Sequence, residues 1–172
     1  MPSCSTAKNP KGQTITFTES NHSYVSIIDG KEIKYTSGTG FIGKFFPPFD
    51  PDGTITARCA AKEGLTVEAI KAKWKAKADE SCRYGTRVHE CCEDIELDRP
   101  VRNQPENDKE SKAFKNAIMM AKKFRSSIDI LGVEMIVFSP MLKIAGTIDL
   151  FARSRKDGSY LIIDHKTNQS ID

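Results

Sequence analysis

The chain has 172 residues, of which 38% are hydrophobic and 28% are charged, and its 26 basic and 23 acidic side chains give a formal net charge of +3. This composition is typical of one soluble globular domain with a substantial core. It excludes a polyelectrolyte that binds nucleic acid by overall charge alone. No run of about 18 apolar residues is present, so we expect no membrane partner.

Residues 1–13 lack the apolar segment of a secretory signal, and we predict a flexible N-terminal tail there. The five cysteines are odd in number and include no C-x-x-C pair. This usage favours reduced thiols over disulfides, and the spacing does not favour a zinc or iron–sulfur site. We therefore predict a cytoplasmic protein.

The first regular elements are predicted to be strands at residues 14–18 and 23–28, where apolar and polar side chains alternate. Asp29 and Gly30 follow the second strand directly. An Asp-Gly pair between apolar runs is a strong hairpin signal, so we predict that the chain turns here onto a further strand at residues 31–36.

Residues 37–54 are rich in glycine, proline and phenylalanine, and Pro47-Pro48 prevents a helix at that point. We predict a structured loop. Its aromatic side chains could stack on nucleic-acid bases. Packing over the hydrophobic core is the more frequent role of such side chains, and we favour it here. The residues concerned are Phe41, Phe45, Phe46 and Phe49.

Helices are predicted next, from capping residues, glycines and apolar spacing. They cover residues 55–63, a segment capped by Thr66 that extends to about Glu80, a segment from about Gly85 to Asp98, and residues 109–131 with Gly132 as the terminating residue. The lysines of the second helix are spread around it, so we predict a solvated helix rather than a DNA-binding stripe. A strand at residues 133–138 follows.

The most informative stretch is residues 144–166, which reads as a hairpin around a second Asp-Gly turn. Asp149, Asp164 and Lys166 share one face of this hairpin, because side chains alternate along a strand. A two-residue turn would set Asp149 opposite Lys166, and an offset of one step per strand would set it opposite Asp164. Two acids and an ammonium in an apolar hairpin indicate a site.

These residue types suit phosphodiester hydrolysis. Carboxylate oxygens bind Mg²⁺, a bound metal activates water, and a lysine supplies positive charge at the phosphate. His89 lies one helical turn after Gly85 and could complete the metal shell, which would favour Mn²⁺. The simpler alternatives are a satisfied histidine and a surface ion pair between Asp149 and Lys166. That ion pair does not explain Asp164 on the same face.

The order of these motifs resembles that of the PD-(D/E)XK nuclease superfamily, and most closely its RecB-like and phage-exonuclease branch. The resemblance covers residues 85–166. The motifs that carry it are G-x-x-x-H (Gly85, His89), G-x-x-D (Gly146, Asp149) and D-x-K (Asp164, Lys166). It implies an α/β (α+β) fold with a restriction-endonuclease-like core, in which helices pack on a small mixed sheet that contains an antiparallel three-strand meander.

The resemblance also implies a Mg²⁺- or Mn²⁺-dependent deoxyribonuclease, an exonuclease more than an endonuclease, that works in phage-type recombination or repair. The metal would be held by His89, Asp149, Asp164 and the main-chain carbonyl of His165. Asp149, Asp164 and Lys166 would be the catalytic residues. From the residues themselves, we expect Arg87 to contact the DNA backbone, because it is a basic side chain on the helix that carries His89. Thr167 is the second expected DNA contact.

We predict a single nuclease domain at residues 14–172, with the N-terminal hairpin and helices at 14–132 and the catalytic meander at 133–172. In the family the core continues past D-x-K with a helix and a strand. We therefore expect a chain truncated at its C-terminus, or a sheet completed by a homo-oligomer or another partner. The alternative function is a catalytically silent nucleic-acid-binding or scaffold module of the same fold.

Overall fold

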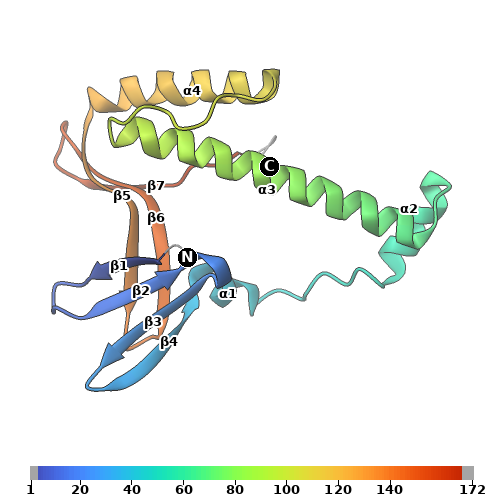
Figure 1. Ribbon diagram of the computed structural model, residues 1–172, viewed down its shortest axis with the longest axis horizontal. Coiled ribbons are helices and arrows are strands. Elements are labelled where there is room, and N and C mark those ends of the chain that lie inside the picture. Colours follow the sequence, from blue (N-terminus) through green and yellow to red (C-terminus); the bar gives the residue numbers. More distant parts are fainter. Residues whose placement is uncertain (1–3, 168–172) are drawn as a thin grey trace. The chain divides into compact units, whose positions relative to one another are not determined.

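The computed structural model describes residues 4–167, and these form a mixed α/β structure with four α-helices and a seven-stranded, mostly antiparallel sheet (Figure 1). Contacts divide the described chain into two compact units. Residues 4–47 and 125–164 form the first, here called the sheet unit, and residues 48–124 and 165–167 form the second, here called the helical unit. The mixed α/β class is confirmed, and the restriction-endonuclease-like core stays a prediction.

The sheet unit contains every strand of the described chain, one short α-helix and one 3-10 helix. Its elements are β1 (Cys4–Lys8), β2 (Thr14–Thr18), the 3-10 helix η1 (Glu19–Asn21), β3 (Ser23–Ile28), β4 (Lys31–Ser37), α1 (Gly38–Gly43), β5 (Ile128–Ser139), β6 (Ile144–Ser154) and β7 (Tyr160–Ile163). The strands lie in the order β1-β2-β3-β4-β6-β5, and β7 also pairs with β6. Only the short pairing of β4 with β6 is parallel among the described strands.

Strand β1 lies within the segment predicted as a flexible tail. It pairs with β2 over five residues, from Cys4 opposite Thr18 to Lys8 opposite Thr14. The predicted hairpin between β3 and β4 is confirmed. Asp29 and Gly30 at its turn have φ angles of 51° and 72°, the left-handed values that a two-residue type I′ turn requires.

The core of the sheet unit forms where β2, β3, β4 and the start of β6 meet. Ile15, Tyr24, Tyr35 and Ala145 are buried together there. The hydroxyl of Tyr35 is 2.7 Å from that of buried Ser26, so this polar pair is satisfied inside the core. This packing fixes β6, the strand that carries Asp149.

Strands β5, β6 and β7 pair antiparallel in chain order, as the predicted meander requires. Strand β5 begins at Ile128, however, so the prediction of a helix over 109–131 with Gly132 as its end is wrong for its last residues. The helix ends at Arg125. Ile128 and Leu131 fit helical spacing, whereas Ile128 and Ile130 fit strand alternation, and pairing with β6 decides for the strand.

The helical unit contains three helices, α2 (Thr54–Glu63), α3 (Val67–Glu96) and α4 (Asp108–Arg125). The Thr66 side chain caps α3 by accepting from the Ala69 amide at 3.1 Å, as predicted. The prediction of two separate helices over residues 66–98 is wrong, because α3 runs through Gly85 without a break. A glycine inside a helix costs only about 1 kcal/mol relative to alanine, which packing can offset.

Packing between α3 and α4 forms the core of the helical unit. Val88, Cys91, Cys92 and Phe114 are buried together. Across residues 4–167, no helix combines the length and the apolar character needed to cross a membrane.

The phenylalanine-rich segment does not pack over the core, contrary to the favoured interpretation. Phe45 and Phe46 are 72% and 66% exposed, and Phe41 lies edge-on to Phe45 with ring centroids 5.4 Å apart. In the helical unit, Phe49 is 66% exposed and contacts Trp74. These rings are accessible to a partner.

Candidate metal site

Asp149 and Asp164 are brought together by the hairpin of β6 and β7. The pairing of these strands ends with Leu150 opposite Ile163, and one step further sets Asp149 opposite Asp164. Of the two registers that the sequence allowed, the structure therefore has the second. The turn explains this register, because it is longer than two residues. It is closed by a hydrogen bond from the Ser154 amide to the Ser159 carbonyl at 2.8 Å.

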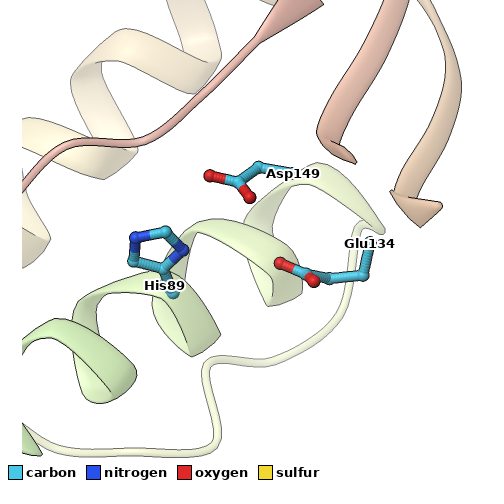
Figure 2. Close-up of side chains that lie close together, drawn as sticks. All are labelled: His89, Glu134 and Asp149. Carbon is cyan, nitrogen blue, oxygen red and sulfur yellow. The ribbon is translucent and has the colours of Figure 1, made fainter. Parts of the chain in front are cut away.

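A carboxylate from β5 approaches Asp149, and Asp164 does not belong to this close group. A carboxylate oxygen of Glu134 and one of Asp149 lie within 4.8 Å of one another (Figure 2). Asp149 is half-buried and Glu134 is exposed. The sequence analysis did not single out Glu134, although a usable signal was present. It is the only charged residue in the apolar run 133–138, on the strand that pairs with the strand of Asp149.

Glu134 has an unusual backbone conformation for a residue inside a strand. Its φ is 48°, and the regular pairs on either side of it are Val133 with Leu150 and Met135 with Ile148. A left-handed conformation costs a non-glycine residue about 1–2 kcal/mol. Strain of this kind concentrates at functional sites, where the surrounding structure maintains it. Here it accompanies the approach of Glu134 to Asp149.

His89 projects from α3 in the helical unit and is half-buried (Figure 2). Its ring lies edge-on to that of His165, with the centroids 6.0 Å apart. The His165 ring nitrogen Nε2 is 2.8 Å from Oε1 of Glu96, so this side chain is paired within the helical unit. The predicted metal contact of residue 165 uses its main-chain carbonyl. That contact and the ligand role of His89 stay predictions.

The other residues of the predicted site lie at the end of the described chain. Lys166 is exposed and Thr167 is half-buried. A Cβ added at Gly85 would lie 3.4 Å from Oγ1 of Thr167, so this glycine leaves room on α3 for residue 167. The catalytic role of Lys166 and the DNA contact of Thr167 stay predictions.

Arg87 was predicted to contact DNA, and the structure gives its guanidinium other partners. It donates to both carboxylate oxygens of Glu110, at 3.0 and 3.1 Å, and it lies 3.2 Å from Glu106. The Arg87 side chain is 15% exposed and that of Glu110 is 2% exposed. The hydrogen bond from Arg87 holds the pKa of the Glu110 carboxyl below its usual value. Arg87 thus clamps α3 to the start of α4, and the DNA contact stays a prediction.

Glu134 and Asp149 are the carboxylates of the sheet unit that belong to the candidate cation site. They offer hard oxygen ligands, which Mg²⁺ and Mn²⁺ prefer, and Glu134 and Asp149 are already within the distance that one ion can bridge. Compared with protein-family models, with curated proteins and with solved structures, the chain matches none.

Proposed function

We propose that this chain is a Mg²⁺- or Mn²⁺-dependent deoxyribonuclease. The observation that carries the proposal is the approach of Glu134 to Asp149 within 4.8 Å, from a left-handed backbone position on β5. Two carboxylates at this separation repel one another, and a divalent cation reverses the sign of their interaction. Metal binding gives a reason for a strained backbone that holds the two carboxylates close together, whereas folding alone gives none.

Asp149, Asp164 and Glu134 would hold the ion, and the motif order of the sequence adds His89 and the main-chain carbonyl of His165. A divalent ion bound there polarises a phosphoryl oxygen and lowers the pKa of a coordinated water. Lys166 places a compact positive charge at the phosphate, where negative charge develops. Asp149, Asp164 and Lys166 are the catalytic residues in this proposal.

We propose DNA as the substrate and an exonuclease of phage-type recombination or repair as the role, both on the resemblance in motif order. The exposed rings of Phe45 and Phe46 support a nucleic-acid partner, because unpaired bases stack on such rings. Arg87 and Thr167 are kept as proposed DNA contacts. A cytoplasmic location agrees with the free cysteines. A homo-oligomer or another partner could add a strand beside β7.

The test is cleavage of end-labelled linear and of circular DNA with Mn²⁺ or Mg²⁺. We expect metal-dependent loss of the linear substrate, abolished in Asp164→Asn and strongly reduced in Glu134→Gln. The matched control is Asp129→Asn, since Asp129 also lies on β5 but pairs with Arg155 at 2.7 Å. Cleavage of circles would indicate an endonuclease. Absence of cleavage together with absence of metal binding would refute the proposal.

A second candidate is a catalytically silent nucleic-acid-binding or scaffold module. The same exposed phenylalanines favour its nucleic-acid-binding form, since they need no metal to stack on bases. DNA binding that is unaffected by metal, without cleavage of any substrate, would support this candidate over the nuclease.

A further inference from the structure

The helical unit contains a pocket of about 370 Å³ between α3, α4 and residues 165–167. This volume lies within the usual range of small-molecule sites, about 300–1,000 Å³. Its lining is mainly apolar, with Val88, Ala117 and Phe124 among its walls. Charged groups are few. They are three lysines and one acidic residue: Lys109, Lys112, Lys166 and Glu96.

Glu96 is the distinctive group in this lining. Its side chain is only 6% exposed, and Oε1 is 2.8 Å from the ring nitrogen Nε2 of His165. The other oxygen, Oε2, is buried and has no hydrogen-bond partner among residues 4–167. A buried carboxylate oxygen that lacks a donor is costly and rare in folded proteins. Glu96 lines the pocket, so an N–H group of a ligand would satisfy this oxygen once the carboxylate turns toward the cavity.

The lining restricts the chemistry of such a ligand. A pure hydrocarbon would leave Glu96 Oε2 unsatisfied, and a small anion would leave both that oxygen and the apolar walls without a partner. The apolar walls and the rings of Tyr84 and Phe124 suit a flat, largely apolar body. The lysines suit an anionic group attached to that body. A nucleobase with its phosphate has all three features.

We infer that this pocket binds one nucleotide, with an exocyclic amino group of the base donating to Glu96 and the phosphate held by Lys109 and Lys112. Carboxylates accept from such amino groups in base recognition, as in contacts to cytosine N4. The Lys109 ammonium lies 4.1 Å from the centroid of the Tyr84 ring, which keeps this charge at the pocket lining. Choosing a nucleotide rests on the proposed function, whose substrate is DNA.

Two features of the ligand follow from the pocket. Bases in a duplex are paired and stacked, so a base from DNA must be unpaired and unstacked to enter the pocket. Thymine has no exocyclic amino group, so cytosine, adenine and guanine should be preferred over it. The nucleotide could be the end of a single strand or a free mononucleotide, and both present the same base and phosphate.

The test is calorimetric titration of the full chain with dCMP, dTMP and a short oligodeoxycytidylate, in a chelating buffer without divalent metal. We expect dCMP to bind at least about tenfold more tightly than dTMP, which corresponds to one hydrogen bond to a charged group. Ala117→Trp should fill the pocket and abolish binding. Met119→Trp is the control, because Met119 lies on α4, is 61% exposed and does not line the pocket.

Glu96→Gln should remove the preference for dCMP over dTMP, and thermal unfolding checks that this variant folds. Tighter binding of the oligonucleotide would assign the pocket to a strand end, and equal binding would assign it to a free nucleotide. Absence of binding by the wild type, or binding unchanged in Ala117→Trp, would overturn the inference. Metal-dependent DNA cleavage without nucleotide binding would refute the nucleotide-binding role of the pocket and leave the nuclease proposal in place. Nucleotide binding without cleavage would refute the nuclease proposal and leave the nucleotide-binding role in place.

Discussion

Glu134 on β5 and Asp149 on β6 approach one another with carboxylate oxygens within 4.8 Å, and Glu134 does so from a backbone φ of 48°. The regular pairs Val133–Leu150 and Met135–Ile148 enclose this irregular position, so the surrounding sheet fixes it from both sides. The sheet thus holds two carboxylates within the reach of one ion at a position where the backbone is strained. The proposed cation would be bound by both carboxylates and would give a reason for the strain.

This relationship predicts opposite effects of one substitution on stability and on metal binding. Glu134→Gly should leave the free energy of unfolding unchanged or raise it by up to about 1 kcal/mol, because glycine adopts a positive φ without steric cost. The same variant should bind Mn²⁺ at least about tenfold more weakly, because a carboxylate ligand is lost. Urea unfolding and calorimetric titration with Mn²⁺ measure the two quantities.

Asp129→Asn serves as the control for that experiment, since it removes an acidic group from the same strand while leaving Glu134 in place. Its Mn²⁺ affinity should equal that of the wild type. If Glu134→Gly destabilised the chain and kept its Mn²⁺ affinity, Glu134 would be a structural residue and no ligand.

The sequence predicted the shared face of Asp149 and Asp164 because strand alternation determines it whatever the register. It could not choose the register, since that depends on how residues 155–158 close the turn. Glu134 was missed for a related reason. A single charge in an apolar strand normally points to solvent, and only the pairing of β5 with β6 brings it to Asp149.

The helix boundaries show the same limit. Gly85 and Gly132 were both predicted to mark helix ends, yet the first lies inside α3 and the second lies inside β5. The difference in helix propensity between glycine and alanine, about 1 kcal/mol, is too small to decide whether a helix ends at either glycine. Packing against Phe114 and pairing with β6 decide them, and both involve residues distant in the sequence.

Arg87→Met should lower the stability of the chain because it leaves the buried Glu110 carboxylate without its main partner. The loss should exceed that of Arg83→Met, whose side chain is 64% exposed. Thermal unfolding measures both. Because Arg87 is also a proposed DNA contact, the slope of log affinity for DNA against log salt should fall by about one in Arg87→Met. An unchanged slope would show that Arg87 stabilises the fold and does not contact a phosphate.

Asp94→Asn should destabilise the chain at neutral pH, because Arg102 donates to Asp94 from its backbone amide at 2.8 Å and from its guanidinium at 2.7 Å. These bonds hold the pKa of the Asp94 carboxyl below its usual value. A carboxyl group whose pKa is lower in the folded than in the unfolded chain stabilises the fold at pH values above the unfolded pKa, about 3.9. This stabilisation is lost as the pH falls through the folded pKa.

The difference in unfolding free energy between wild type and Asp94→Asn should therefore be about 2–3 kcal/mol from pH 6 to 8. It should shrink steadily below about pH 4. Urea unfolding across this pH range measures it, with Asp79→Asn as the exposed control, whose partner Lys75 is also exposed. A difference that stayed constant down to pH 3 would show that Asp94 is not the group responsible.

The cysteines should differ sharply in reactivity. Cys4 and Cys82 are exposed, whereas Cys91 is fully buried between α3 and α4. Burial raises the pKa of the Cys91 thiol to about 11, and the nearby Asp94 carboxylate adds to this shift. Because the thiolate is the reactive form, alkylation with iodoacetamide at pH 8 should label Cys4 and Cys82 first.

Peptide mapping should find Cys91 labelled only after unfolding in guanidinium. Labelling of Cys91 in the native chain would contradict its burial between α3 and α4.

The exposed phenylalanines give a test that separates binding from folding. Phe45 and Phe46 are 72% and 66% exposed, so the double variant Phe45→Ser, Phe46→Ser should change the free energy of unfolding by no more than about 0.5 kcal/mol. Stacking of a base on an aromatic ring contributes about 1–3 kcal/mol. The affinity for an oligothymidylate should therefore fall at least about fivefold, measured by fluorescence anisotropy.

Ile27→Ser is the control, because Ile27 is 64% exposed on β3 and offers no ring. Oligothymidylate is the suitable probe, since thymine gains least from Glu96, so a loss of affinity reports on the rings. An unchanged affinity in the double variant, with Ile27→Ser also unchanged, would show that these rings serve some partner other than single-stranded DNA.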